Sequence, residues 1–248
     1  MSPPLFANTV PMDTQPPPFG TLWGDSRDAI SPSLLQDLGR FDHVQGSPRA
    51  LLEVLAACVR HTQPLALRLG RTEASQDLTL TVFPRQRLVH CPMAMAEFES
   101  SPRLSWPVLG IDPTRLTPPA EPGDKAGHAG LRSPVSPHQA PWYPLAPLLW
   151  AVALGGERWS LLPELDGQAA YRVAPGTHLA GLDVPGAMQV CVTRLRRETC
   201  NLRDIADWRQ LGTERAMRLL NALYLQSALI VSRSHPAATN EGWAGYRR

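Results

Sequence analysis

The sequence carries little charge of either sign and almost no lysine. Charged residues make up 19% of the 248 residues, the formal net charge is +2, and Lys125 is the only lysine. Proteins that hold nucleic acid or anionic surfaces through bulk electrostatics are usually far more basic. The overall charge therefore favours neither partner. The use of arginine in place of lysine, together with a bias toward alanine, proline and leucine, suggests a GC-rich bacterial genome.

Long apolar runs and paired cysteines are also missing. No apolar stretch approaches the ~20 residues that span a bilayer. The first residues, MSPPLFANTVPMDTQPPP, have neither the basic start nor the apolar core of a secretory signal. The cysteines lie far apart without a C-x-x-C pair, at Cys58, Cys91, Cys191 and Cys200. We therefore expect a cytoplasmic, reduced and metal-free protein with no membrane association, in which Cys58 and Cys191 are buried free thiols.

The familiar catalytic motifs are absent as well. The sequence has no G-x-G-x-x-G, Walker A loop, H-E-x-x-H or G-x-S-x-G. Among seven scattered histidines, His90 in a predicted strand is the one candidate for a site, and without a partner motif a satisfied or surface histidine is the better interpretation. Asp204 and Asp207 are flanked by Arg203 and Arg209, which suits a solvated, charge-balanced helix face. We expect no enzyme activity, no cofactor and no small-molecule ligand.

Proline, by contrast, is abundant, with 26 residues gathered near the start and in the middle. Residues 1–30 are predicted to be a disordered Pro-rich arm. Its aromatic cluster around Phe19 and Trp23 could dock on the body or on a partner, and docking on the body is the simpler expectation. Residues 113–141 are dense in Pro, Gly and Ala and predict a flexible linker or loop. Residues 233–248 are predicted to be a polar tail.

Between these stretches the sequence predicts an α+β domain over residues 31–180. Ser31-Pro32 and Ser47-Pro48 each pair a cap with the proline that a first helical turn tolerates. The second of these opens a helix over Arg49–His61 with a wide apolar stripe. Three β-prone runs follow, at Leu65–Leu69, Leu78–Phe83 and Arg87–Cys91. The alternation of leucine and valine with threonine in the middle run is typical of a half-buried strand. A small antiparallel sheet with packed helices is the expected fold.

The second half of this domain is predicted from weaker signals. Trp142–Leu154 is apolar almost all round, which predicts a buried helix. Asp166-Gly167 is a good hairpin dipeptide between the β-prone runs Trp159–Leu162 and Ala169–Val173. Thr177–Leu182 is a further candidate strand. Asp183 is then expected to cap a helix that continues to Leu195.

The C-terminal stretch Asn201–Val231 has the order helix, tight turn, helix, strand. Asn201 is a good cap for a first helix, and Thr213 for a second that begins just after Gly212. Leucines and alanines recur at helical spacing through this second helix, and Leu229–Val231 is a short β-prone run. The order predicts a winged-helix-like module over residues 183–232, in which the last strand begins the wing.

Two segments resemble a known family. The stretch SPRALLEVLAACVRHTQPLALRLG followed by LTVFPRQRLVHC resembles the amino-terminal part of the bacterial PATAN domain, an accessory module of signalling proteins. That family has a P-x-x-L-L-x-x-L helix before a strand pair whose second member reads like G-R-I-V-H-A. Here the second member is QRLVHC at residues 86–91, with glutamine in place of glycine. PATAN-type proteins also tend to end in a helical element that is similar to LRDIADWRQLGTERAMRLLNAL. The resemblance implies a signalling accessory role.

Two functions follow from this organisation. The first is a non-catalytic bacterial signalling or regulatory adaptor that binds another protein, since helix-turn-helix folds serve widely as docking elements. The second is a transcription regulator whose second helix enters the major groove of DNA. With the apolar face buried, the side chains available for either macromolecule are expected to be Arg203, Arg209, Arg215, Arg218, Asn221 and Gln226. Arginine and asparagine pair bidentately with guanine and adenine, but Glu214 lies at the tip that would approach DNA.

Overall fold

The computed structural model of the chain describes residues 29–40, 50–70, 77–99, 106–119 and 142–238. The predicted Pro-rich arm lies almost wholly before residue 29. The centre of the predicted linker lies in 120–141, and the end of the predicted tail lies after 238. These three predictions therefore lie mainly outside the described ranges, which include only residues 29–30 of the arm, 113–119 of the linker and 233–238 of the tail.

An antiparallel five-stranded sheet forms the first half of the molecule. Its strands are β1 (Leu65–Leu69), β2 (Leu78–Phe83), β3 (Leu88–His90), β4 (Val108–Pro113) and β5 (Trp142–Pro144), in the order β4-β1-β2-β3-β5. The register sets Leu67 opposite Leu80, and Val82 opposite Val89. These four side chains are completely buried. The period-2 pattern of the sequence therefore places one face of the sheet in the core.

Three helices accompany this sheet, namely α1 (Pro32–Gly39), α2 (Leu51–His61) and α3 (Met95–Glu99). Ser31 caps α1, because its Oγ accepts the amide of Leu34 at 3.3 Å. The leucines of α2, including Leu52 and Leu55, join the same buried cluster as the inner face of the sheet. The two predicted amphipathic helices thus pack as an α+β unit. The predicted start of the second helix at Ser47-Pro48 is wrong, because α2 begins at Leu51 with Ala50 at its N-cap and no side-chain cap.

A buried helix, α4 (Leu145–Gly155), follows the fifth strand directly. The prediction of one helix over Trp142–Leu154 is wrong at its start. Pro144 disfavours helical backbone for Tyr143, so the chain stays extended through Trp142–Pro144 and pairs with β3. Among the described residues, no helix is both long and apolar enough to cross a membrane.

A second, three-stranded antiparallel sheet lies in the C-terminal half. It consists of β6 (Ala170–Val173), β7 (Cys200–Asn201) and β8 (Leu229–Ser232), in the order β7-β6-β8. Its helical elements are α5 (Gly186–Leu195), α6 (Leu202–Asp207), η3 (Trp208–Gln210), α7 (Thr213–Leu225) and η4 (Pro236–Ala238). The central strand β6 precedes residue 183, so the predicted module boundary divides this sheet.

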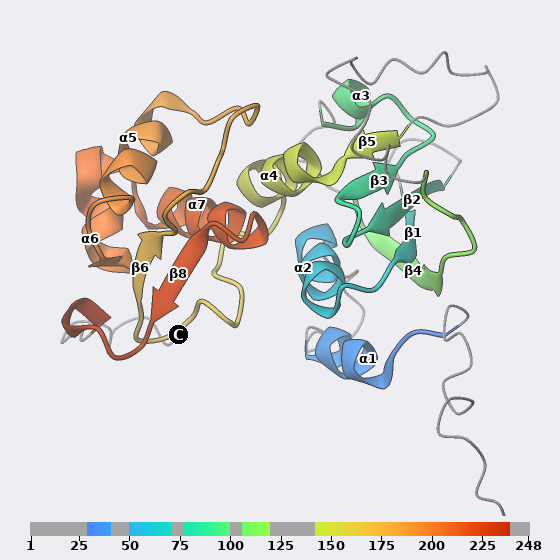
Figure 1. Cartoon of the computed structure of the whole chain (residues 1–248), viewed down its shortest axis with the longest axis horizontal. Coiled ribbons are helices and arrows are strands. Elements are labelled where there is room, and N and C mark those ends of the chain that lie inside the picture. The colour runs from blue at the N-terminus through green and yellow to red at the C-terminus, as the bar shows by residue number, and fades with distance from the viewer. Residues whose placement is uncertain (1–28, 41–49, 71–76, 100–105, 120–141, 239–248) are drawn as a thin grey trace, which may run out of the picture.

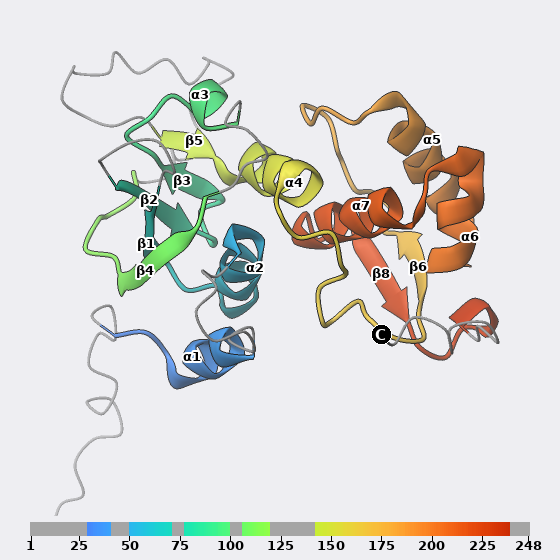
Figure 2. The same ribbon diagram turned by 180° about the vertical axis from the view of Figure 1, so that it is seen from behind.

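The two halves lie on either side of α4 (Figure 1). The helix contacts α2 of the first half and α7 of the second. The view from behind shows the same order, with α4 between the five-stranded sheet and the α5–α7 group (Figure 2). Buried residues of both halves belong to one continuous cluster that includes Leu55, Leu149 and Leu220.

The predicted α+β fold class, with a small antiparallel sheet and packed helices, is confirmed. Asn201 caps α6 as predicted, with its Oδ1 accepting the amide of Asp204 at 2.9 Å. Thr213 does not cap α7, because Gly212 takes the N-cap position with φ +82° and no side chain. Asp183 likewise does not cap α5, whose N-cap is Pro185.

Two predicted strands are wrong. Trp159–Leu162 pairs with no strand, because Asn221 takes up its backbone groups. Nδ2 of Asn221 donates to the carbonyl of Ser160, and Oδ1 of Asn221 accepts from the amide of Leu162. Thr177–Leu182 pairs with no strand, and Gly176 just before it and Gly181 within it have φ +74° and +84°. Within the described residues β8 pairs with β6, which lies earlier in the chain, and not with a following strand. The winged-helix-like assignment stays a prediction.

Candidate functional site

The helix expected to recognise a macromolecule, α7, is largely internal. It packs against α4 on one side, and on the other against α6 and the three-stranded sheet (Figure 1). Seven of its thirteen residues are buried. Some of its polar side chains therefore face other parts of the protein and others face solvent.

Asn221 is completely buried, contrary to the sequence prediction. Its Nδ2 donates to the carbonyl of Ser160 at 2.9 Å, and its Oδ1 accepts the amide of Leu162 at 2.9 Å. The bond to Leu162 satisfies a buried amide, and the carbonyl of Ser160 accepts from Arg158 as well as from Asn221. The side chain is buried and hydrogen-bonded within the protein, so it is not available to a base or a partner.

Arg218 and Gln226 are also turned toward the protein. Arg218 donates from Nη1 to the carbonyls of Leu154 and Gly156, at 3.0 and 2.6 Å, and its side chain is 15% exposed. It thus satisfies carbonyls at the C-terminus of α4, where a cation is favoured. Gln226 donates to the carbonyl of Ala146 at 2.8 Å and accepts from Arg87 at 3.2 Å. The predicted exposure of these side chains is wrong, because α4 covers this side of α7.

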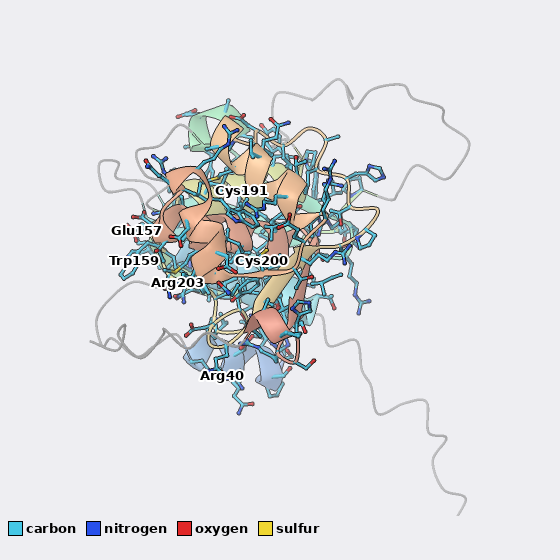
Figure 3. All side chains as sticks on the ribbon, turned by 90° about the vertical axis from the view of Figure 1, so that its left-hand side faces the viewer. Arg40, Glu157, Trp159, Cys191, Cys200 and Arg203 are labelled. Atoms are coloured by element: carbon cyan, nitrogen blue, oxygen red, sulfur yellow. The ribbon has the colours of Figure 1, made fainter. Side chains whose placement is uncertain are left out.

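The other three candidates remain at the surface. Arg203 of α6, Arg209 of η3 and Arg215 in the first turn of α7 are exposed. Arg203 is visible on the C-terminal half when the molecule is seen along its long axis (Figure 3). The six predicted residues therefore divide into three that hold the fold together and three that face solvent.

Sequence reasoning missed a segment that joins the two halves. We call residues 156–168, between α4 and β6, the strap. Arg158 of the strap forms an ion pair with Glu53 of α2. Glu164 of the strap forms one with Arg60 of α2, which also pairs with buried Asp37. Together with Asn221, these pairs tie the strap to both halves of the molecule.

The strap presents a tryptophan to solvent. Trp159 is 60% exposed, the largest exposed fraction among the large apolar side chains that the structure describes. It protrudes at the rim of the molecule in Figure 3. On one side of it, Arg158 donates from Nε to the carbonyl of Ser160 at 3.2 Å, and on the other Ser160 is held by Asn221. These hydrogen bonds therefore restrain the backbone that carries the indole. A tryptophan between an arginine and a serine gives no sequence signal for this, because the restraining partners lie far away in the chain.

His90 and Cys58 each pack against other residues of the first half. The His90 ring lies edge-on to Trp142, with centroids 5.0 Å apart, and burial lowers the pKa of this imidazole. Burial also raises the pKa of the Cys58 thiol to about 12, and this thiol donates to the carbonyl of Gln63. Within the ranges that the structure describes, no group of three or more His, Cys, Asp or Glu side chains could hold a metal ion.

Comparison with protein-family models, with curated proteins and with solved structures finds no match. The PATAN resemblance therefore stays a prediction, and the function must be argued from the site.

Proposed function

We propose that this protein is a non-catalytic signalling or regulatory adaptor that acts by binding another protein. The observation that carries the proposal is Trp159, a large aromatic side chain that is 60% exposed on a restrained segment. Burying an indole on a partner releases a large apolar area from water. Tryptophan is also among the residues most enriched at the energetic centres of protein interfaces.

The restraint on the strap adds to this argument. Association loses free energy when a loop must be ordered on binding, so a segment that is fixed beforehand binds more tightly. The backbone around Trp159 is held by the Arg158–Glu53 ion pair and by two hydrogen bonds of Asn221. These contacts reach α2 and α7, so a partner bound at Trp159 would contact the part of the molecule where its two halves meet.

DNA binding ranks second. Recognition of DNA bases by α7 would require Arg218, Asn221 and Gln226 at its surface. These side chains instead form hydrogen bonds to the strap, to α4 and to Arg87. The exposed Arg203, Arg209 and Arg215 could still contact phosphates, which position a protein on DNA without reading sequence. A protein partner makes use of Trp159, whereas the DNA hypothesis leaves it unexplained.

The test is affinity capture with the full chain in cells that produce it, comparing the parent with Trp159→Ala. A matched control is Leu35→Ala, which removes another apolar side chain that is 53% exposed, on α1. We expect a specific protein to be captured by the parent and by the control. Loss of a hot-spot residue costs at least ~2 kcal/mol, about 30-fold in affinity, so Trp159→Ala should not retain it.

Equal capture by Trp159→Ala and the parent, or recovery of DNA fragments in place of a protein, would overturn the proposal. Folding of each variant is checked by its melting temperature, because a surface substitution should leave stability within about 0.5 kcal/mol of the parent.

A further inference from the structure

The outward face of α5, away from the strap, carries exposed apolar and charged side chains. Met188, Cys191 and Leu195 point into the core, and the polar residues between them face solvent. An open hollow of about 430 Å³ runs along this outward face. Its lining includes Val190, which is 43% exposed, together with Arg194, Arg197 and Glu198. The hollow thus combines one apolar side chain with two arginines and one carboxylate.

Arg194 of this hollow is held in position, and a further arginine, Arg209, lies on η3 next to the tryptophan that Arg194 contacts. The Arg194 guanidinium lies 4.4 Å from the centre of the Trp208 ring, a cation–π contact, and its Nε donates to Glu198 at 3.0 Å. Arg209 sits on η3 in left-handed backbone, with φ +47°, followed by Gln210 with φ +56°. A non-glycine residue adopts this conformation only where the surrounding structure enforces it.

Charged side chains of both signs lie near the two cysteines of this half. Burial raises the pKa of the Cys191 thiol, and Arg194 and Arg209 act against that rise. Burial also raises the pKa of the Cys200 thiol, where Glu198 and Asp204 add to the rise and Arg194 opposes it. Arg194 therefore lies near both cysteines, which Figure 3 shows at different heights, and Arg209 adds positive charge near Cys191.

Some of the basic groups are not neutralised. Glu198 is engaged by Arg194. Arg197 and Arg209 are exposed and form no ion pair with any residue that the structure describes. An exposed guanidinium recognises a carboxylate through two parallel hydrogen bonds, which gives both attraction and orientation. The surface therefore complements negative charge that comes from outside the chain.

We propose that this surface, made of Val190, Arg194, Arg197, Trp208 and Arg209, binds an acidic segment of the protein partner that also carries an apolar side chain. We call it the α5 arginine face. The inference rests on the proposed adaptor function and specifies the chemistry of the partner. Carboxylates of the segment pair with Arg197 and Arg209, and its apolar side chain contacts Val190. Arginine and tryptophan are the residues in which protein-binding surfaces are enriched.

The test selects short random peptides against the intact protein and measures the selected peptides by fluorescence anisotropy. The variant is the double substitution Arg197→Glu with Arg209→Glu. The matched control is Arg172→Glu, with one exposed arginine of β6 reversed outside the face. We expect the selected peptides to be acidic, and their Kd to rise about ten-fold or more in the double variant but not in the control. Added salt should weaken binding, because these pairs are exposed to solvent.

Selection of neutral or basic peptides, or equal binding by the double variant, would overturn the inference. A short DNA duplex is titrated in parallel. If it binds the parent, loses binding in the double variant, and shows the steep salt dependence of phosphate contacts, the face belongs to nucleic acid and the inference falls.

The outcome is separable from that of the adaptor proposal. Partner capture that depends on Trp159, without any acidic peptide bound, would retain the adaptor and reject the α5 arginine face. Acidic peptides bound at the face, without any captured partner, would support the face and count against the adaptor.

Discussion

Two helices of the C-terminal half, α5 and α7, use their polar side chains in opposite ways. On α7, Asn221 and Arg218 bond to backbone carbonyls of the strap and of α4. On α5, Gln189 faces solvent beside an open hollow, and Arg197 does so just after the helix ends. Both helices look amphipathic in sequence, yet only α5 leaves its polar face free. A polar residue at helical spacing is therefore no guide to function until the other side of the helix is known.

The difference arises because α7 is covered on two sides. One side contacts α6 and β8, and the other contacts α4. The buried arc is therefore wider than the apolar stripe that Leu219, Leu220 and Leu223 define. Polar residues within that extra arc must find partners inside the molecule, because an unpaired polar group costs free energy when it is buried.

The largest effect should come from the apolar centre of α7. Leu223 is completely buried, whereas Val190 of α5 is 43% exposed. We expect Leu223→Ala, or Leu220→Ala, to lower the free energy of unfolding by roughly 2–5 kcal/mol through lost burial and cavity formation. Val190→Ala should change it by no more than about 0.5 kcal/mol. Chemical denaturation of the three variants measures this difference. Similar losses of unfolding free energy for substitutions on both helices would contradict the conclusion that α7 is covered and the outward face of α5 is open.

The Tyr171 side chain, which binds the end of the strap, should make the free energy of unfolding depend on pH in the alkaline range. The Tyr171 hydroxyl donates to the carbonyl of Leu165, and burial raises the pKa of this phenol to about 12. The unfolded tyrosine ionises near pH 10, so between these pH values the unfolded state binds fewer protons and stability falls as pH rises. We expect a loss of about 2 kcal/mol across this window.

Tyr171→Phe should remove that part of the slope, although it also removes the hydrogen bond at neutral pH. Denaturation of parent and variant at several pH values from neutral to strongly alkaline makes the comparison. An identical slope in both proteins would mean that the Tyr171 phenol keeps an ordinary pKa, and that this end of the strap is open to water.

The buried amide of Asn221 gives the next effect. Asn221→Ala leaves the buried amide of Leu162 without its partner, and leaves Arg158 as the side chain that still donates to the carbonyl of Ser160, at a cost of about 1–3 kcal/mol. Gln189→Ala on the open face of α5 should be nearly neutral. Melting temperatures compare the two. Hydrogen exchange should also show the Leu162 amide losing protection in Asn221→Ala, and unchanged protection would mean that Asn221 does not restrain the strap.

The smallest effect on stability is expected at the proposed docking residue. Trp159→Ala removes a side chain that is mostly in water already, so the free energy of unfolding should stay within about 0.5 kcal/mol of the parent. A calorimetric scan tests this directly. A marked loss of stability would show that the indole is packed in solution, and would remove the observation on which the adaptor proposal depends.

Local patterns predicted much of the fold because their causes are local. The alternation in Leu78–Phe83 places leucine and valine on one face of β2, and a side chain beside the first turn caps α1 and α6. The strap had no such signal. Its backbone groups bond to Asn221, about sixty residues later, and a β-prone composition then gives the wrong prediction.

The candidate site was predicted only in part, for the same reason. Arg203, Arg209 and Arg215 are exposed as expected, because they lie on surfaces that no other described element covers. Arg218, Asn221 and Gln226 were misplaced, because nothing in the sequence indicates that α4 packs against α7. Pro144, which ends β5 and directly precedes α4, was the one residue whose local effect could have corrected the start of that helix.

The most direct test is site-specific photo-crosslinking in cells that produce the protein. A photoreactive amino acid is placed at position 159 in one variant and at position 226 in another. We expect position 159 to crosslink to a second protein. Position 226, which lies against α4 and Arg87, should give only crosslinks within the chain. Crosslinks from position 226 to DNA or to another protein, with none from position 159, would contradict the account.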